Sequence, residues 1–157
     1  MDGISLLEGK RVLIVDDEPD VSETLEGLLS ICEVKKAYSF DEGKKLLETQ
    51  HFDFAILDIM GVNGYELLKI ANNRNVIAVM LTAHALSPDD LRRSFNEGAA
   101  YYVPKDKMAE ITTYLSDILE AKEKGKSLWW RWQERFASYF DRKYGPDWQK
   151  RHGIAVR

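Results

Sequence analysis

The sequence of 157 residues contains a single cysteine, Cys32, so an intrachain disulfide is excluded. It has no apolar run near the roughly 18 residues that a membrane-spanning helix needs. The first ten residues, MDGISLLEGK, lack the basic-then-apolar pattern of a secretory signal. Hydrophobic residues make up 45% and charged residues 31%, the balance of a folded globular protein. We therefore expect a cytoplasmic protein.

Positive charge is scarce in the first two thirds of the chain. Residues 1–106 hold 11 Lys and Arg against 19 Asp and Glu, a net charge of −8. Residues 107–157 hold 11 against 7, a net charge of +4, so the whole chain carries −4. We expect the chemistry in the acidic part, and the basic C-terminal part needs a separate explanation.

Short apolar runs alternate with amphipathic stretches over about the first 120 residues. Apolar runs rich in β-branched or aromatic residues favour the strands of a parallel sheet that is covered on both faces. The expected strands are residues 12–15, 33–38, 54–57, 76–81 and 101–103.

The stretches between these runs repeat apolar residues at helical spacing. Ser87-Pro88-Asp89 predicts a helix start, with Ser87 as the N-cap and proline at the first helical position. A fifth helix is expected from Met108 to Lys122. Five strand–helix units with short connections predict an α/β fold, a doubly wound parallel sheet with right-handed crossovers.

Polar residues follow four of the expected strands. In doubly wound sheets, ligands bind beyond the carboxyl ends of the strands, so side chains at these positions meet at one edge. Each residue alone has an ordinary structural explanation, such as a solvated loop or a surface lysine, and only their joint placement predicts a site. These residues are Asp16 and Asp17, Asp58, Thr82 and Lys105.

Clustered carboxylates repel one another and raise each other's pKa values unless a cation compensates. Mg²⁺ suits a site with few protein oxygens, because it keeps several waters. We expect Asp17 and Asp58 as direct ligands, Asp16 as a direct or water-mediated one, and the backbone carbonyl of Met60 as a further oxygen. Asp58 could then attack a phosphoryl group, with Lys105 and Thr82 stabilising its oxygens.

Four separated motifs carry a resemblance to a known family. LIVDDEPDV, FAILDIM, VMLTAHA and GAAYYVPKD resemble the response-regulator receiver domain of two-component phosphorelays, over about residues 9–124. The resemblance implies a flavodoxin-like (βα)5 fold with strand order 2-1-3-4-5. It implies Asp58 as the phospho-acceptor, Asp16 and Asp17 as the acidic pair for Mg²⁺, Thr82 as the switch hydroxyl, Lys105 as the site lysine and Tyr102 as the rotating aromatic. For Tyr102 the alternative is a half-buried strand residue.

The loop after Asp58 departs from the family pattern. In DIMGVNGYEL the chain reaches Gly64 about two residues early, and Gly61 stands where a bulkier residue is common. Because this loop borders the site, its shorter length bears on the carbonyl geometry and on the phosphoryl lifetime, and the sequence determines neither.

Three functions remain open. The first is a response regulator that is not an enzyme, takes a phosphoryl group from a histidine kinase or phosphotransfer protein, and signals through a downstream protein or a second copy. The second is a Mg²⁺-dependent phosphohydrolase, against which Met60 argues, because such enzymes place a general acid two residues after their nucleophile. The third is a scaffold that keeps the fold without cycling.

Residues 125–157 form an aromatic, basic extension after Gly125, and all four tryptophans lie in residues 129–148. The pattern predicts an amphipathic helix that Gly145-Pro146 ends. Packing on the receiver or on a second copy is favoured, followed by docking on another protein and by membrane-surface binding; nucleic acid is the least expected partner. The chain thus resembles a receiver without a classical output domain. The predicted apolar face holds Leu128, Trp129, Trp132, Phe136, Tyr139, Phe140 and Tyr144, with Arg131, Glu134, Arg135, Ser138 and Arg142 opposite.

Overall fold

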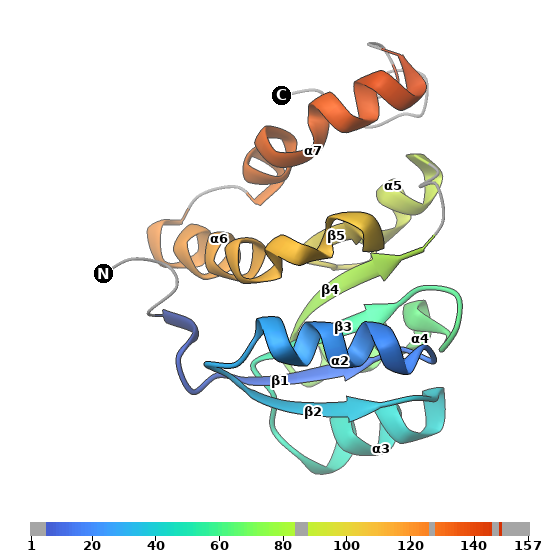
Figure 1. Cartoon of the computed structure of the whole chain (residues 1–157), viewed down its shortest axis with the longest axis vertical. Coiled ribbons are helices and arrows are strands. Elements are labelled where there is room, and N and C mark those ends of the chain that lie inside the picture. The colour runs from blue at the N-terminus through green and yellow to red at the C-terminus, as the bar shows by residue number, and fades with distance from the viewer. Residues whose placement is uncertain (1–5, 84–87, 126–127, 146–147, 149–157) are drawn as a thin grey trace.

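The computed structural model describes residues 6–83, 88–125, 128–145 and 148, with the backbone alone for 128–131 and 143. A parallel sheet with strand order β2-β1-β3-β4-β5 forms its centre. All strands run in one direction, so their carboxyl ends share one edge (Figure 1). This confirms the predicted fold and strand order. The strands are β1 (Arg11–Val15), β2 (Glu33–Ala37), β3 (Phe54–Asp58), β4 (Ile77–Thr82) and β5 (Tyr101–Pro104).

Burial along the strands follows their place in the sheet. Every residue of the central strand β3 is buried, whereas β2 alternates between exposed and half-buried residues up to Ala37. A central parallel strand is covered by helices on both faces, and an edge strand is covered less completely. This explains why the apolar signal was weakest for β2.

Helices cover both faces of the sheet. Those on one face are α2 and α6, and those on the other are α3, α4 and α5 (Figure 1). Tyr65 of α4 also donates to the backbone of Asp90 in α5, which ties these neighbours together. The helices are α2 (Pro19–Leu28), α3 (Phe40–Thr49), α4 (Gly64–Asn73), α5 (Pro88–Asn96), α6 (Ile111–Lys124) and α7 (Leu128–Tyr144).

The start of the fifth helix differs from the prediction. A 3-10 helix, η1, spans Lys105–Glu110, and α6 begins only at Ile111. The amide of Ile111 donates to the carbonyl of Met108, an i to i+3 bond. Apolar residues three apart suit both helix types, so the spacing could not tell them apart. The predicted N-cap, Ser87, lies outside the described residues.

Helix α6 ends at Gly125, whose φ of 67° is the left-handed conformation that glycine adopts without strain. Helix α7 follows and lies beyond the edge strand β5 (Figure 1). The division of the chain into 9–124 and 125–157 remains a prediction.

The predicted amphipathic helix is present. On its inner face Trp132, Phe136 and Phe140 are buried, while the side chains of Leu128 and Trp129 lie outside the described part of the chain. Arg135, expected opposite this face, is exposed and also forms an ion pair with Asp117 of α6. Its long side chain reaches back to a buried carboxylate that a helical wheel cannot show.

None of the described helices combines the length and apolar character that crossing a lipid bilayer requires.

Candidate functional site

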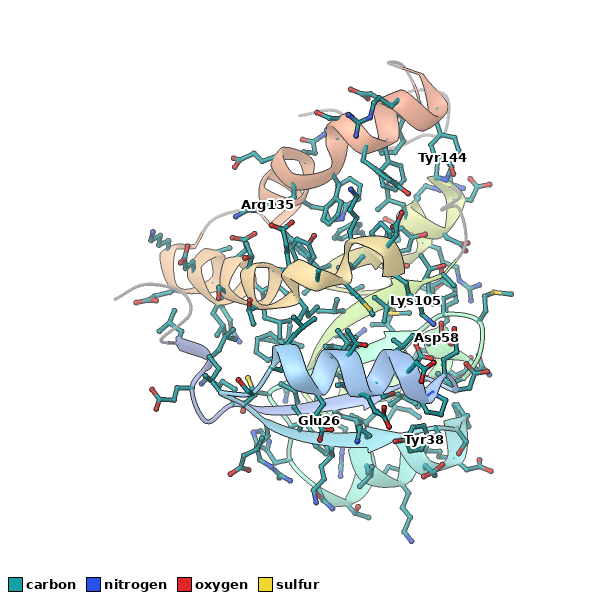
Figure 2. The ribbon with its side chains drawn as sticks, in the orientation of Figure 1. Glu26, Tyr38, Asp58, Lys105, Arg135 and Tyr144 are labelled. Atoms are coloured by element: carbon teal, nitrogen blue, oxygen red, sulfur yellow. The ribbon has the colours of Figure 1, made fainter. Side chains whose placement is uncertain are left out.

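Lys105 lies among the acids at the carboxyl edge of the sheet. Its Nζ atom is 2.8 Å from Oδ2 of Asp16 and 3.6 Å from Oδ1 of Asp58. Lys105 follows β5, Asp16 follows β1, and Asp58 ends β3, so three separate strands place these groups. Figure 2 shows Lys105 and Asp58 next to each other at the end toward which the strands point.

The acids after β1 form a compact group. Asp16 is 0% exposed, and its Oδ1 accepts the backbone N–H of Glu18 at 2.8 Å. One carboxylate oxygen each from Asp16, Asp17 and Glu18 lies within 4.8 Å of the others. Such a group of hard oxygens is the donor set that a divalent cation prefers.

The loop after β3 approaches both Asp17 and Asp58. Asp58 is 4% exposed, and its Oδ2 accepts the backbone N–H of Gly61 at 3.0 Å. A Cβ atom at Gly61 would lie 2.3 Å from Oδ1 of Asp17 and 2.4 Å from Oδ2 of Asp58. Glycine therefore leaves free the space between two carboxylates that any side chain would fill. The residues present thus fit a small cation between Asp17 and Asp58.

Beside these acids is a cavity of about 180 Å³. Met60 lies at its mouth with 76% of its surface exposed. Asp58 lines this cavity, whose volume suits a small group. The lining residues are Asp17, Glu18, Asp58, Met60, Gly61, Ala83 and Lys105.

The charges in this site shift each other's pKa values. Burial raises the pKa of Asp16, although Lys105 and the amide of Glu18 partly offset the rise. Burial and the charge of Asp16 likewise raise the pKa of Asp58. Burial lowers the pKa of Lys105, but hydrogen bonds to Asp16 and Glu18 outweigh it and leave the pKa raised. The site thus holds surplus negative charge that a cation would neutralise.

The two expected switch residues lie on β4 and β5. Thr82 ends β4, is buried, and pairs in register with Pro104 of β5. The residue after Thr82, Ala83, lines the cavity. Tyr102 is fully buried, and its hydroxyl has no hydrogen-bond partner among the described residues. Among the described residues, the ring of Tyr102 is therefore held by packing and not by a polar contact of its hydroxyl.

Two contributions to the site were not predicted from the sequence. Oε1 of Glu18 lies 2.8 Å from Nζ of Lys105, and the backbone N–H of Gly61 donates to Asp58. Glu18 belongs to the same acidic run as Asp16, so the sequence indicated that it lies near the site. The sequence did not indicate that Glu18 pairs with Lys105. Asp20 of that run is exposed in the first turn of α2. His84, two residues after Thr82, lies outside the described residues.

Comparisons with known proteins identify the family of this chain. A family model described as the response regulator receiver domain matches residues 12–116. The heme response regulator HssR of Staphylococcus aureus (strain Newman) is 38% identical over 102 residues, which cover 60% of this chain and 44% of HssR. The chain thus spans less than half the length of that curated relative.

Solved structures show the same fold. A CheY-like response regulator receiver domain protein from Methanospirillum hungatei JF-1 is 28% identical with a TM-score of 0.60, over 72% of this chain and 98% of that one. A two-component response regulator from Clostridium difficile is 21% identical with a TM-score of 0.64, over 71% and 96%. Since the family model covers well over half of its length, this chain belongs to the response regulator receiver domain family of two-component systems.

Proposed function

We propose that this receiver domain accepts a phosphoryl group on Asp58 from a histidine kinase or phosphotransfer protein in a Mg²⁺-dependent reaction. The observation that carries the proposal is the position of Lys105, whose Nζ lies between Oδ2 of Asp16 and Oδ1 of Asp58. An ammonium group at that place can neutralise charge on a phosphoryl oxygen as transfer proceeds. The signal would then pass to a downstream protein in the cytoplasm through changed protein contacts.

The acids of the site would hold the metal. Asp17 and Asp58 are the proposed ligands, with Asp16 and the backbone carbonyl of Met60 contributing further oxygens. When bound, Mg²⁺ supplies positive charge that offsets the repulsion between carboxylate and phosphoryl group.

The chain's own residues would carry the transfer. A carboxylate oxygen of Asp58 forms a bond to phosphorus, while the bond from phosphorus to the donor's nitrogen breaks and that nitrogen keeps the electron pair. Lys105 neutralises the equatorial oxygens, and the hydroxyl of Thr82 donates to one of them. In the phosphorylated state Thr82 is drawn toward the phosphoryl group and Tyr102 repacks, a shift between two populations.

The site favours one transfer over continuous hydrolysis. Aspartate-nucleophile phosphatases place a general acid two residues after the nucleophile, and here that residue is the exposed Met60. The proposed role is therefore a signalling one and not that of a phosphohydrolase.

The test is to incubate the protein with acetyl phosphate and Mg²⁺ and to measure the labile adduct by intact-protein mass spectrometry. We expect one phosphoryl group per chain, lost in Asp58→Asn and retained in Asp20→Asn, which removes an exposed carboxylate of the same acidic run. Release of many equivalents of phosphate per chain would instead indicate a phosphohydrolase. Absence of any adduct would indicate a non-cycling scaffold.

A further inference from the structure

Helix α7 rests on a surface that α5, β5 and α6 build together, which we call the α5-β5-α6 surface. The ring of Trp132 meets Phe95 of α5 edge-on at 5.9 Å. Phe136 lies 6.3 Å from the ring of Tyr101 in β5 and 5.2 Å from Tyr114 in α6. One helical face thus contacts all three elements. Its inner residues are buried against the chain's own receiver.

Two polar contacts orient the helix on this surface. The indole Nε1–H of Trp132 donates to the backbone carbonyl of Tyr102 at 2.8 Å. Arg135 donates from Nε and Nη2 to the two oxygens of Asp117, at 2.9 and 3.2 Å. Asp117 is buried, and Tyr101 also donates to it. Figure 2 shows Arg135 on the side of α7 that faces α6. Directional bonds of this kind fix one position and orientation of α7 on the surface.

The carbonyl that holds Trp132 belongs to the strand that carries Lys105. Strand β5 is only four residues long, Tyr101–Pro104, and Lys105 follows it directly. In the unmodified chain Nζ of Lys105 is 2.8 Å from both Asp16 and Glu18, and farther, 3.6 Å, from Asp58. In the structure in which α7 is docked, Lys105 is therefore paired mainly with Asp16 and Glu18 and less closely with Asp58.

A phosphoryl group on Asp58 would change that pairing. It adds negative charge and strong acceptor oxygens beside Lys105. The ammonium of Lys105 would then move away from Asp16 and Glu18 and toward the phosphoryl oxygens. Any shift of the end of β5 alters the position of the Tyr102 carbonyl, and a hydrogen bond weakens steeply once its length or angle departs from the optimum. Within the described part of the chain, the ring of Tyr102 is held by burial and its hydroxyl has no polar anchor.

We propose that α7 is the chain's own ligand for the α5-β5-α6 surface and that phosphorylation of Asp58 weakens its docking. This inference rests on the proposed function, because it requires a phosphoryl group on Asp58. Since coupling between two sites is reciprocal, loosening α7 also strengthens the binding of a phosphoryl mimic at Asp58. The contrary possibility is that α7 is a permanent layer that covers the edge strand.

The first experiment measures amide hydrogen exchange in the full chain with Mg²⁺, in the presence and absence of beryllium fluoride. Beryllium fluoride mimics the phosphoryl group. Fluorine NMR reports separately whether the mimic is bound. We expect exchange in α7 to become about fivefold faster or more, the lower end of typical coupling between sites. Helix α3, which packs near the opposite edge of the sheet, serves as the internal control.

Unchanged or slower exchange in α7 with the mimic bound would overturn this inference and leave the proposed function intact. Failure of the mimic to bind would overturn both.

The second experiment compares the affinity for beryllium fluoride among variants. Trp132→Phe keeps a ring but removes the N–H that reaches Tyr102, and Arg135→Gln removes the pair with Asp117. We expect both variants to bind the mimic several-fold more tightly. Trp148→Phe is the matched control, because its indole N–H donates to Asp141 within the tail. Equal affinity in all variants would overturn the coupling, and Arg135→Gln keeps the test valid if Trp132→Phe does not fold.

Discussion

The ammonium of Lys105 lies 2.8 Å from Oδ2 of Asp16; the Asp16 side chain is fully buried, and that of Lys105 is 10% exposed. Removing one partner of a buried ion pair leaves the other charge without compensation in a poorly solvated place. The same pair gives Lys105 its position next to Asp58. The contribution of Lys105 to the stability of the fold can therefore be measured separately from its role in phosphoryl transfer.

Lys105→Met is expected to lower the free energy of unfolding by about 3 kcal/mol at neutral pH, because Asp16 loses its cation. Mg²⁺ should restore part of this loss by supplying positive charge. Urea denaturation with and without Mg²⁺ measures both effects. The matched control is Lys36→Met, whose pair with Glu26 has the same 2.8 Å length but is more exposed. It should change stability by less than about 1 kcal/mol. Equal losses in the two variants would contradict the assignment of a buried pair.

Gly61→Ala should weaken Mg²⁺ binding about tenfold or more, the scale on which residues that orient metal ligands act. The added Cβ would lie 2.3 Å from Asp17 and 2.4 Å from Asp58, so the carboxylates must move apart. Isothermal titration measures the affinity. Gly27→Ala is the control, since no described residue lies within 4 Å of its Cβ position in α2. That variant should keep its affinity and gain about 0.5–1 kcal/mol of stability. An unaltered affinity in Gly61→Ala would exclude a cation between these two carboxylates.

Mg²⁺ should stabilise the protein in proportion to its affinity. At a concentration ten times its Kd, the gain is about 1.4 kcal/mol. For a chain of this length that gain corresponds to a rise in Tm of roughly 3–6 °C. Asp17→Asn should remove the rise because it removes a proposed ligand, whereas Asp20→Asn should keep it. Thermal scans before and after addition of a chelator test this. A rise that survives in Asp17→Asn would place the ion elsewhere.

Asp58→Asn should stabilise the protein at neutral pH. Burial and the charge of Asp16 raise the pKa of Asp58 above its ordinary value of 3.8. A carboxyl group with a raised folded pKa contributes stability below the unfolded value and loses it as pH rises through the folded one. The ionised group is therefore unfavourable at pH 7. Replacing it should raise Tm by a few degrees, the response to about 1 kcal/mol.

The gain in Asp58→Asn should shrink as pH falls toward 3.8, because the native carboxyl then becomes protonated. Asp41→Asn is the control: Asp41 is exposed in the first turn of α3, where a negative charge is favourable, so that variant should gain nothing at pH 7. A gain in Asp58→Asn that does not vary with pH would show that its charge is not the cause.

Much of the fold could be predicted because its signals are local. A run such as Phe54–Leu57 is apolar throughout since a central parallel strand is covered on both faces. The acids at its end could be placed because all carboxyl ends share one edge. The start of α6 could not, since apolar residues three apart suit both the 3-10 turn at Met108 and an α-helix.

Details of the candidate site depended on distances between segments far apart in the chain. The sequence identified Lys105 and the acidic run, but not that Glu18 lies 2.8 Å from Lys105. It marked Gly61 as a departure, but not that its N–H donates to Asp58. Such contacts depend on how a loop turns by a few ångströms, which no local pattern encodes.

Helix α7 shows most clearly which features the sequence determines and which depend on the tertiary structure. The sequence by itself determined that residues 128–144 form an amphipathic helix, because periodicity is a property of the segment alone. Only the tertiary structure decided where that helix lies, with Trp132 on the carbonyl of Tyr102 and Arg135 on Asp117. A helix can bury an apolar face on any surface of matching shape. The choice among surfaces depends on buried polar groups that find partners only after the rest of the chain has folded.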